Sequence, residues 1–411
     1  MTEHFDVAII GASHAGAHAA ITLRERGFTG SVLLIGEEPV LPYDRPSLSK
    51  AYMLGSISIE RILLRDADYW AEHGIDLLLD TSAAHLDPAA ATVRLGDGRT
   101  IGYGRCILAT GGHVRTLACP GADLPGIHMV RSLVDVDAIR AALKPGMKAA
   151  IVGAGYVGLE AAAVLRELGH EVVVVETQDR VLARVTGPVL SAFVERKHRA
   201  HGVDFRFGRH VAAIEGDGRA EHVLLSSGER LAADIVIVGI GIAPRTELAE
   251  AAGLACDGGV LVDQCGRTSD PAIFAIGDCA RHPNSYAGGL WRLESVQHAT
   301  ASAEVAADAI MGNPRNYDAL PTFWSDQYDM RIQSAGILRG ACEALVRGDP
   351  DSGAFSIFYL KDGAVVALDA VNSPRDFMGG RALVQERLRV PPELLADTAV
   401  PVRQIVKQLV S

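Results

Sequence analysis

The stretch from residue 148 to Glu176 constrains the fold of this chain more than any other. A short apolar run meets the pattern Gly153-x-Gly155-x-x-Gly158, an Ala- and Leu-rich segment follows, and a run of valines ends on Glu176. This order predicts a strand, a helix and a second strand. The glycines allow a tight turn, close approach of a pyrophosphate and close helix–strand packing, while the terminal acid accepts a ribose hydroxyl. Because a helix N-terminus favours an anion, we predict a dinucleotide site here.

The same pattern occurs near the start of the chain. An apolar run over residues 5–10 precedes Gly11-Ala-Ser13-His-Ala-Gly16, and a second apolar run ends on Glu37. Ser13 takes the place of the middle glycine, and its small side chain still permits close approach of a phosphate. Two such units in one chain favour two dinucleotides, and a flavin paired with a nicotinamide is the economical combination.

The repeat extends beyond the glycine patterns. Residues 74–79 predict a strand, residues 92–101 a hairpin around Asp97-Gly98, and residues 106–111 a separate strand that ends on Thr110-Gly111. Residues 202–207, 224–231 and 234–241 repeat this order in the second half. The repeat therefore predicts two nucleotide-binding domains of one architecture.

The last third of the chain changes in character. Residues 259–263 and 273–276 predict strands, the second of which ends on Gly277-Asp278, and residues 294–311 predict a long helix. Ligands of α/β sheets bind at the C-terminal ends of such strands. From residue 321 onward, strand-like residues at 323–328 and 332–333, a hairpin over 355–368 and a helix over 374–389 predict an antiparallel α+β domain.

Composition and charge exclude several classes of function. The 411 residues are 48% hydrophobic and 22% charged, which is ordinary for a globular protein with sizeable cores. A net charge of −11 argues against binding to nucleic acid or to an anionic membrane surface. Because the first strand begins within a few residues of Met1 and the Ala-rich helices carry charges, we expect no signal peptide, no membrane span and a cytoplasmic location.

The six cysteines lie at positions 106, 119, 256, 265, 279 and 342 and form no CxxC pair. This spacing argues against a zinc site, a thioredoxin-like site and an iron–sulfur cluster on this chain, so we expect no metal site. Cys106 lies in an apolar run and is expected in the core.

Several motifs carry a resemblance to a known family. They are Pro42-Tyr-Asp-Arg-Pro-Ser-Leu-Ser-Lys50, Leu108-Ala-Thr-Gly111, Val174-Val-Glu-Thr-Gln178, Val238-Gly-Ile-Gly241, Ala275-Ile-Gly-Asp278 and Phe323-Trp-Ser-Asp-Gln327. Over essentially its whole length the chain resembles the FAD-dependent NADH:ferredoxin reductases of bacterial cytochrome P450 and aromatic-ring dioxygenase systems, the putidaredoxin reductase type. The resemblance implies a glutathione-reductase-like α/β fold with two Rossmann-type nucleotide domains plus a C-terminal α+β domain. The implied divisions are an FAD domain at 1–113 and 245–320, an NADH domain at 114–244 and a C-terminal domain at 321–411.

The resemblance also implies which residues hold a non-covalent FAD. The first glycine loop would hold the pyrophosphate, Glu37 the adenosine ribose, Asp278 the ribityl chain, and the helix start at Ser295 the pyrimidine end of the flavin. The full set is Gly11, Ser13, His14, Ala15, Gly16, Glu37, Arg45, Lys50, Thr81, Thr110, Gly111, Arg131, Gly277, Asp278, Ser295, Val296 and Trp324.

A second set would hold NADH as the substrate. It consists of Gly153, Gly155, Tyr156, Val157, Gly158, Glu160, Glu176, Gly239, Ile240 and Gly241. The Glu176 carboxylate would face the 2′-phosphate of NADPH, and two like charges about 4 Å apart at an effective dielectric of ~20 repel by about 4 kcal/mol. We therefore predict NADH. Lys50 and Glu160 are the expected catalytic residues, a pair that orients the nicotinamide for hydride transfer.

The expected function is electron transfer from NADH through FAD to a small [2Fe-2S] ferredoxin that feeds a cytochrome P450 or a Rieske-type oxygenase, by a monomer or homodimer. Disulfide reductases of this fold carry cysteine after the first nucleotide unit, and residues 40–52 hold none. Alternative functions are a rubredoxin reductase, a nitrite-reductase-type subunit, an NADH-sensing flavoprotein that binds a partner, and a flavin-free NAD protein. Alternative roles for single residues are a solvated helix carboxylate for Glu160, a core side chain for Trp324, a solvent-facing imidazole for His14, surface cations for Arg45 and Lys50, and a turn aspartate for Asp278.

Overall fold

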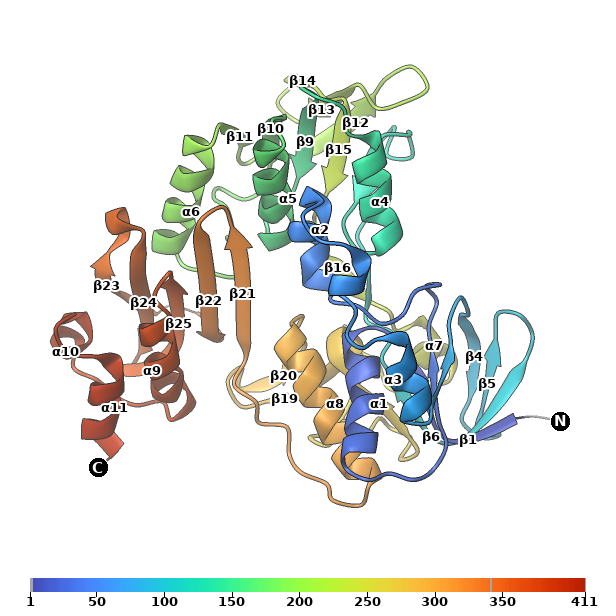
Figure 1. Ribbon diagram of the computed structural model, residues 1–411. Helices are drawn as coiled ribbons and strands as arrows, with labels where there is room; N and C mark the ends of the chain where they lie inside the picture. Colours follow the sequence, from blue (N-terminus) through green and yellow to red (C-terminus); the bar gives the residue numbers. More distant parts are fainter. Residues whose placement is uncertain (1–2, 341, 411) are drawn as a thin grey trace. The chain divides into compact units, whose positions relative to one another are not determined.

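The computed structural model describes residues 3–340 and 342–410, so Met1 and Thr2, which precede the first strand, lie outside the described residues. The chain divides into two compact units, whose helices and strands are labelled in Figure 1. The first unit comprises Met1–Asp44, Ile59–His113 and Ala243–Pro321, and the second comprises Arg45–Ser58, Val114–Ile242 and Thr322–Ser411. Each unit is described by itself below.

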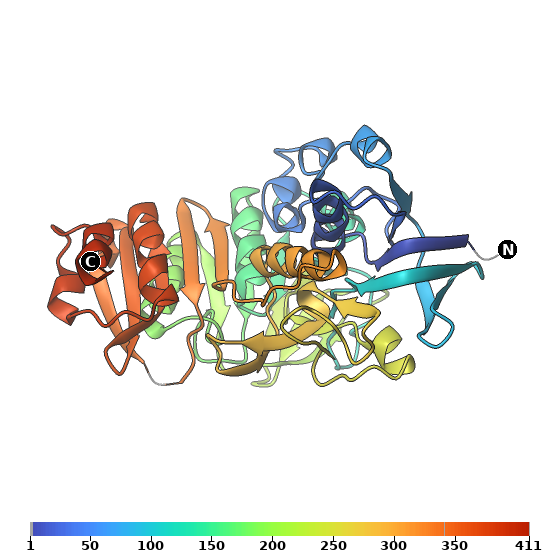
Figure 2. The same ribbon diagram turned by 90° about the horizontal axis from the view of Figure 1, so that it is seen from below.

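The first unit is built on a mixed sheet in the order β3-β2-β1-β6-β5-β4, with β18 paired to β6. The strands are β1 (Glu3–Ile10), β2 (Val32–Ile35), β3 (Ile75–Leu78), β4 (Ala83–Asp87), β5 (Thr92–Leu95), β6 (Thr100–Leu108) and β18 (Ile273–Ala275). Strand β2 is buried along its whole length, as expected of a parallel strand that is covered on both faces. Helices α1 (His14–Glu25) and α8 (Val296–Ile310) lie side by side against the sheet (Figures 1 and 2).

The second unit contains a five-stranded parallel sheet in the order β11-β10-β9-β15-β8. Its strands are β8 (Ile127–Met129), β9 (Lys148–Val152), β10 (Glu171–Val175), β11 (Val203–Arg206) and β15 (Ile235–Val238), accompanied by helices α4 (Leu133–Ala142), α5 (Tyr156–Glu167) and α6 (Pro188–Ala200). A separate antiparallel sheet follows the order β12 (Val211–Glu215), β13 (His222–Leu225) and β14 (Arg230–Ala232).

The predicted hairpins exist in both copies of the repeat, but their connection to the parallel sheet differs. In the first copy, the hairpin arm and the strand that ends before Thr110-Gly111 are one continuous strand, β6, so the prediction of two separate strands is wrong there. Strand β1 starts at Glu3 and pairs with β6 from Ile101 onward, which keeps the long strand in register. In the second copy β9 has only five residues, and the corresponding hairpin arm and parallel strand are two separate strands, β14 and β15.

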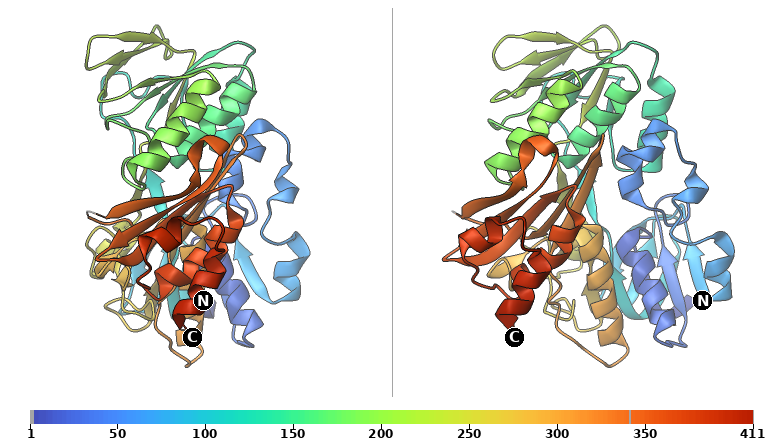
Figure 3. Two further views of the ribbon diagram at one scale, coloured as in Figure 1. Left: turned by 90° about the vertical axis from the view of Figure 1, so that its left-hand side faces the viewer. Right: turned by 60° about the vertical axis from the view of Figure 1, so that its left-hand side comes forward.

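The C-terminal part of the second unit is the predicted antiparallel α+β structure. Its sheet has the order β21-β22-β25-β24-β23, and helices α9, α10 and α11 cover one face (Figure 3). The elements are β21 (Thr322–Gln327), β22 (Met330–Gly336), β23 (Glu343–Asp349), β24 (Ala354–Lys361), β25 (Ala364–Val371), α9 (Pro374–Gln385), α10 (Pro392–Ala396) and α11 (Val402–Val410). Helix α9 stops before the expected residue 389 because Arg387 adopts a positive φ of 48°.

Shorter elements complete the chain. They are η1 (Arg45–Ser49), α2 (Ala51–Leu54), η2 (Ile59–Arg61), α3 (Ala67–Glu72), β7 (Gly112–Val114), β16 (Ile242–Pro244), α7 (Glu247–Ala251), β17 (Val260–Leu261), η3 (Gly277–Cys279), β19 (Ala280–Asn284), β20 (Gly289–Trp291) and η4 (Pro350–Ser352). The motif that begins at Pro42 contains the 3-10 helix η1, whose second residue is Pro46. Among the described residues, no helix has both the length and the apolar character required to cross a membrane.

A buried arginine fixes the C-terminal segment onto the antiparallel sheet. The Arg347 guanidinium on β23 donates to Asp376 Oδ2 at 3.0 Å and to the backbone carbonyls of Leu395 at 2.9 Å, Asp397 at 2.6 Å and Val400 at 2.8 Å. Only 3% of the Arg347 side chain is exposed. Burial of this cation is therefore balanced by one carboxylate and three carbonyl groups.

We expect the substitution Arg347→Met to lower the free energy of unfolding by about 3–5 kcal/mol, because it strips partners from buried polar groups. Urea unfolding followed by circular dichroism measures the loss, and hydrogen exchange of residues 391–400 should accelerate. The control is Arg196→Met, since the Arg196–Asp351 pair has side chains that are 58% and 81% exposed. Exposed pairs contribute about 0–1 kcal/mol. Equal losses in the two variants would contradict the anchoring role.

Candidate functional site

In the glycine loop of the second unit, backbone segments lie in close contact with one another. Gly153 follows β9 with a φ of +104°, and a Cβ added there would lie 2.4 Å from the carbonyl oxygen of Gly239. A Cβ on Gly158 would lie 2.2 Å from the carbonyl oxygen of Gly153. Neither position has room for a side chain. The residues after β15, Gly239 to Gly241, are thereby held against the start of α5, as the predicted site requires.

Gly155 differs from its two neighbours in the motif. It is the N-cap of α5 with a φ of −78°, and a Cβ added there would meet no atom within 4 Å. The first turn of α5, which includes Tyr156 and the exposed Val157, contains no acidic residue, so no carboxylate within that turn offsets the helix dipole. The open space in front of this helix end fits a pyrophosphate.

Glu176 is held beside this loop by its own hydrogen bonds. Its Oε2 accepts from the backbone N–H of Ala154 at 2.7 Å, and its Oε1 accepts from the N–H of Gln178 at 2.9 Å and from the hydroxyl of Thr177 at 3.0 Å. The carboxylate therefore lies at the end of β10 next to the glycine loop, where the ribose of a bound dinucleotide is expected.

The first unit repeats this construction. Gly11 has a φ of +115°, and a Cβ there would lie 2.1 Å from the carbonyl oxygen of Ala109. A Cβ on Gly16 would lie 1.9 Å from the carbonyl oxygen of Gly11. Ser13 is the N-cap of α1, and the first turn of α1 carries no acidic residue. The residues present thus fit a second dinucleotide, in the place predicted for the flavin nucleotide.

His14 is not a solvent-facing residue, so that alternative is wrong. Its side chain is buried, and its Nε2 lies 3.3 Å from Asp44 Oδ1. The imidazole therefore belongs to the packed start of α1. Sequence reasoning missed this partner because Asp44 lies 30 positions away along the chain.

The strand end at Gly277 meets the start of α1. Gly277 has a φ of +65°, and a Cβ there would lie 2.8 Å from the Cβ of Ala15. The N–H of Gly277 also donates to the hydroxyl of Ser302 on α8 at 3.0 Å. Asp278 follows Gly277 in η3, so its backbone lies next to a residue that contacts the start of α1 and the middle of α8.

Helix α8 begins as the sequence predicts. Ser295 is its N-cap and accepts from the N–H of His298 at 3.1 Å, and Val296 is its first residue. No acidic residue lies in its first turn, so this helix end also favours negative charge.

Three of the remaining first-unit residues, Glu37, Thr110 and Gly111, bond to Arg245, which sequence reasoning missed. Arg245 Nη1 contacts Glu37 Oε2 at 2.5 Å, and the backbone carbonyl of Arg245 accepts from the hydroxyl of Thr110 at 2.8 Å. Gly111 follows with a φ of +65°. The backbone N–H of Thr81 donates to the carbonyl of Gly36 at 2.8 Å, which places it beside the strand that leads to Glu37.

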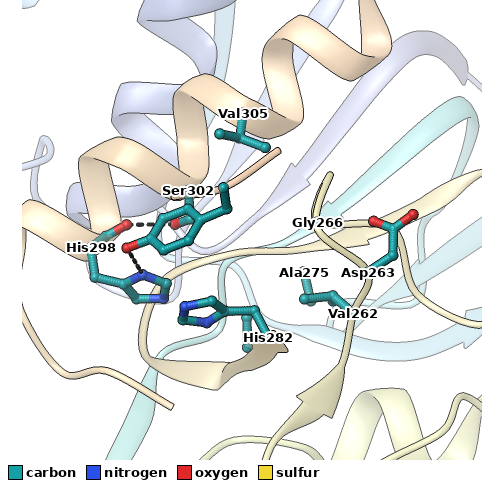
Figure 4. A pocket seen from close by; sticks show the side chains of 10 residues that line it. Val262, Asp263, Gly266, Ala275, His282, His298, Ser302 and Val305 are labelled. Carbon is teal, nitrogen blue, oxygen red and sulfur yellow. Dashed lines mark hydrogen bonds between the residues drawn. The ribbon is translucent and has the colours of Figure 1, made fainter. Parts of the chain in front are cut away.

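A small cavity lies behind the N-terminus of α8, with a volume of about 10 Å³, room for about one water molecule (Figure 4). His282 and His298 stack beside it with ring centroids 4.6 Å apart, and His298 Nδ1 contacts the Tyr317 hydroxyl at 2.9 Å. Burial lowers the pKa of His298 to about 3 and that of His282 to about 4, so both imidazoles are neutral at physiological pH.

The catalytic residues predicted from the resemblance meet within the second unit. Lys50 Nζ lies 3.0 Å from Glu160 Oε1, and the side chains are 19% and 5% exposed. Glu160 also accepts from the hydroxyl of Ser49 at 2.5 Å and from that of Ser325 at 2.5 Å. A solvated helix carboxylate, the alternative for Glu160, is therefore wrong.

Opposing effects act on the Glu160 carboxyl. Burial raises its pKa above the ordinary carboxyl range, while the Lys50 ammonium and the two hydroxyl donors oppose that rise. Sequence reasoning assigned no role to Ser49 or Ser325, although both lie inside motifs that it singled out. A signal was available for Ser325, because alternation along a strand places it on the same face as Phe323 and Gln327.

The other expected residues of this unit are placed as follows. Arg45 Nη1 donates to the backbone carbonyl of Arg131 at 2.7 Å, which joins two segments distant in sequence. Trp324 is half-buried on β21, on the face opposite Phe323, whose ring packs on Tyr156 at a centroid distance of 4.5 Å. A fully buried core position for Trp324 is therefore wrong.

Within the described residues, the cysteines and the other side chains able to bind a metal form neither a disulfide nor a metal cluster. All six cysteines are free thiols, and Cys106 is fully buried, which confirms its expected place in the core. Over residues 3–340 and 342–410, no cluster of three or more His, Cys, Asp or Glu side chains has the arrangement of a metal site.

Comparison with known proteins agrees with this geometry. The family model described as pyridine nucleotide-disulphide oxidoreductase matches residues 5–303, and a model described as reductase C-terminal matches residues 322–406. The chain belongs to the pyridine nucleotide-disulphide oxidoreductase family. This membership confirms the predicted oxidoreductase class and the fold class, a glutathione-reductase-like α/β fold with a C-terminal α+β domain.

Within this family, the chain is similar to proteins named as ferredoxin reductases. A 5,5′-dehydrodivanillate O-demethylase ferredoxin reductase subunit from a Sphingobium species is 48% identical over 405 residues, covering 98% of each chain. A ferredoxin–NAD(P)(+) reductase from a Sphingomonas species is 46% identical over 406 residues, again covering 98% of each chain. The crystal structure of the covalent putidaredoxin reductase–putidaredoxin complex matches with a TM-score of 0.96 and 38% identity, covering 100% of this chain and 99% of the other. The predicted resemblance to ferredoxin reductases is thereby confirmed.

Two glycines of the second loop, Gly155 and Gly153, should respond differently to substitution by alanine. We expect Gly155→Ala to keep the melting temperature, because its Cβ meets open space, but to raise the Kd for NADH at least tenfold, because the methyl group occupies the place of the pyrophosphate. Gly153→Ala should weaken NADH binding and also lower the melting temperature, because its Cβ meets a backbone carbonyl.

Calorimetric titration with NADH and thermal unfolding measure the two effects separately. The control is Gly146→Ala. Gly146 is exposed, lies outside the loop, has a positive φ and has no atom near its Cβ position, so this variant shows the effect of replacing a positive-φ glycine alone. Normal NADH binding by the Gly155→Ala protein would contradict the phosphate site.

Proposed function

We propose that this chain is a cytoplasmic flavoprotein reductase that passes electrons from NADH, through non-covalently bound FAD, to a small [2Fe-2S] ferredoxin serving a cytochrome P450 or a Rieske-type oxygenase. The observation that carries this proposal is the presence of two glycine cradles, one in each unit, each closed by a backbone carbonyl against a positive-φ glycine. Two relatives named as ferredoxin reductases cover almost the whole chain, which supports the choice of acceptor.

We also propose the division into an FAD domain (1–113 and 245–320), an NADH domain (114–244) and a C-terminal domain (321–411). The two glycine loops are assigned to the two pyrophosphates and the acids at the strand ends to the two riboses. Residues given to FAD by resemblance keep that assignment as part of the proposal. They comprise Gly11, Ser13, His14, Ala15, Gly16, Glu37, Arg45, Lys50, Thr81, Thr110, Gly111, Arg131, Gly277, Asp278, Ser295, Val296 and Trp324.

FAD, when bound, accepts a hydride and releases electrons singly. The chain's own residues would bind and orient it. The N-terminus of α1 would hold its phosphates, and the N-terminus of α8, capped by Ser295, would stabilise negative charge by about 0.3–2 kcal/mol. The absence of acidic residues from the first turn of both helices supports these roles.

The overall reaction balances without a cysteine. One NADH gives NAD⁺, one proton and two electrons, and two ferredoxins take one electron each. The free thiols include no cysteine between residues 40 and 52, so a disulfide relay has no place in the proposed path. The thiols also fit a reducing compartment, which supports the cytoplasmic assignment.

Lys50 and Glu160 would act by position. Their pairing brings opposite charges together in a buried place, so that neither charge is left unbalanced beside the nicotinamide. Held in this way, the two side chains provide fixed polar groups for orienting the ring toward the flavin. Neither residue is required to transfer a proton in the hydride step.

Glu176 would select NADH over NADPH. Its carboxylate is already fixed by the Ala154 and Gln178 N–H groups, so it has little freedom to turn away from a 2′-phosphate. The repulsion between the two like charges, about 4 kcal/mol at 4 Å and an effective dielectric of ~20, sets the upper limit of its contribution.

We expect Glu176→Ala to change the ratio of kcat/KM for NADH to that for NADPH by at least tenfold in favour of NADPH, because the repulsion is removed. Steady-state kinetics with a dye acceptor measure the ratio. Glu171→Ala, at the exposed opposite end of β10, is the control and should leave it unchanged. An unchanged ratio in the Glu176→Ala protein would show that another group selects the cofactor.

An anaerobic titration tests the function as a whole. We expect a yellow protein that NADH bleaches within seconds, that NADPH bleaches far more slowly, and that then reduces purified putidaredoxin. A colourless protein would overturn the FAD assignment and favour an NAD protein without flavin. A yellow protein that NADH reduces only over minutes, with no transfer to putidaredoxin, would instead favour the NADH-sensing alternative. Fast reduction by NADH with transfer to rubredoxin but not to putidaredoxin would favour a rubredoxin reductase.

A further inference from the structure

A chain of hydrogen bonds runs from Glu160 through strand β21 to helix α6. The Ser325 hydroxyl donates to Glu160 Oε1 at 2.5 Å, Gln327 Nε2 donates to Ser325 Oγ at 2.9 Å, and His198 Nε2 lies 2.8 Å from Gln327 Oε1. The side chains of Ser325, Gln327 and His198, which follow Glu160 in this series of hydrogen bonds, are all at least 98% buried. Nothing in the proposed roles of Lys50 and Glu160 uses these three residues.

The chemistry of each group fixes the direction of the chain. An ionised Glu160 only accepts, so the single Ser325 proton points to it, and the Ser325 oxygen accepts from the Gln327 amide N–H. The Gln327 carbonyl oxygen then requires a donor, which places a proton on His198 Nε2. His198 Nδ1 is left as an acceptor, and the Tyr328 hydroxyl lies 3.5 Å from it. Every donor in the chain therefore points toward Glu160.

We propose that Ser325, Gln327 and His198 are positioning residues, which form a polarised hydrogen-bond chain that orients the Glu160 carboxylate and keeps it ionised beside Lys50. This inference deepens the proposed function and rests on it for the meaning of Glu160 in hydride transfer. Its structural content, the state of the Glu160 carboxyl, is measured without NADH.

Strand geometry explains why β21 suits this role. Side chains alternate along a strand, so Phe323, Ser325 and Gln327 share one face. Phe323 packs on Tyr156 of α5, Ser325 reaches Glu160 of α5, and Gln327 reaches α6. Asp326 lies between them on the opposite face and is exposed, which makes it a matched control position.

The groups around Glu160 and His198 favour this direction of the hydrogen bonds. The groups that face Glu160 are the Lys50 ammonium, the hydroxyls of Ser49 and Ser325, and the phenol of Tyr156. Burial, with a smaller effect of the nearby His201, lowers the pKa of His198 to about 4, although its bond to Gln327 acts the other way. His198 is therefore neutral near pH 7, and its bond to Gln327 favours the tautomer with the proton on Nε2.

The first test removes the donor next to Glu160. Because a hydrogen bond to a charged group strongly favours the ionised form, Ser325→Ala should raise the pKa of Glu160 further, by about one to two units. Infrared difference spectra of the purified protein against pH, with Glu160→Gln as the reference that lacks the band, report the protonated carboxyl. Ser325→Thr, which keeps the hydroxyl, should restore the titration, and Asp326→Asn should leave it unchanged.

The second test replaces Gln327, the central residue of the hydrogen-bond chain. In Gln327→Glu the new carboxylate has no proton to give to Ser325, and it offers a negative partner to His198. We expect the His198 pKa to rise by at least one unit in an NMR titration and the Glu160 pKa to rise with it. Gln327→Met, which removes the donor without adding charge, should raise the Glu160 pKa less than Ser325→Ala does.

The functional readout separates positioning from folding. Stopped-flow reduction by NADH should show that Ser325→Ala lowers the rate constant of hydride transfer about tenfold near neutral pH, with an acid limb displaced to higher pH and a KM for NADH changed less than twofold. Failure of the proposed function would appear as no reduction by NADH in the unaltered protein, whatever the carboxyl titration shows. Glu160 titrations in Ser325→Ala and Gln327→Glu that match Asp326→Asn would overturn the proposed chain.

Discussion

Two backbone carbonyl groups, those of Ala109 and Gly239, come so close to a neighbouring turn that only glycine can occupy the facing position. The contact fixes the end of one strand against the beginning of the next helix. Both helices then start just after a strand and carry no acidic residue in their first turn, an arrangement that favours an anion at each helix N-terminus. In the proposed function, the two nucleotide sites are thus a consequence of this packing, and Glu176 selects the nucleotide.

The Glu160 carboxyl shows how a polar group is maintained in such a fold. Removing a carboxylate from water is costly, and here an ammonium and two hydroxyls offset that cost. The donors come from η1, from β21 and, through Gln327, from α6. Three segments that are distant in sequence must therefore fold together before the carboxylate has its full set of partners. The protonation state of Glu160 therefore depends on the correct assembly of these three segments of the second unit.

The sequence predicted both strand–helix–strand units, both hairpins and the antiparallel C-terminal sheet, because each depends on local periodicity and on glycines with a local role. It did not predict that β6 continues without a break, since this depends on the length of its partner β1. It singled out Glu176 and Glu160 within motifs but assigned nothing to Ser325, Gln327 and Arg245. These residues act through partners more than 100 positions away in sequence, and periodicity carries no information about such contacts.

The clamp formed by Arg347 has a consequence for how this protein can vary. Three of its four contacts are made to main-chain carbonyls of Leu395, Asp397 and Val400, which every amino acid supplies. The path of the segment is therefore fixed while most of its side chains are not. Related chains can exchange residues along this stretch, and so alter the surface that it presents, without losing the attachment that holds it in place.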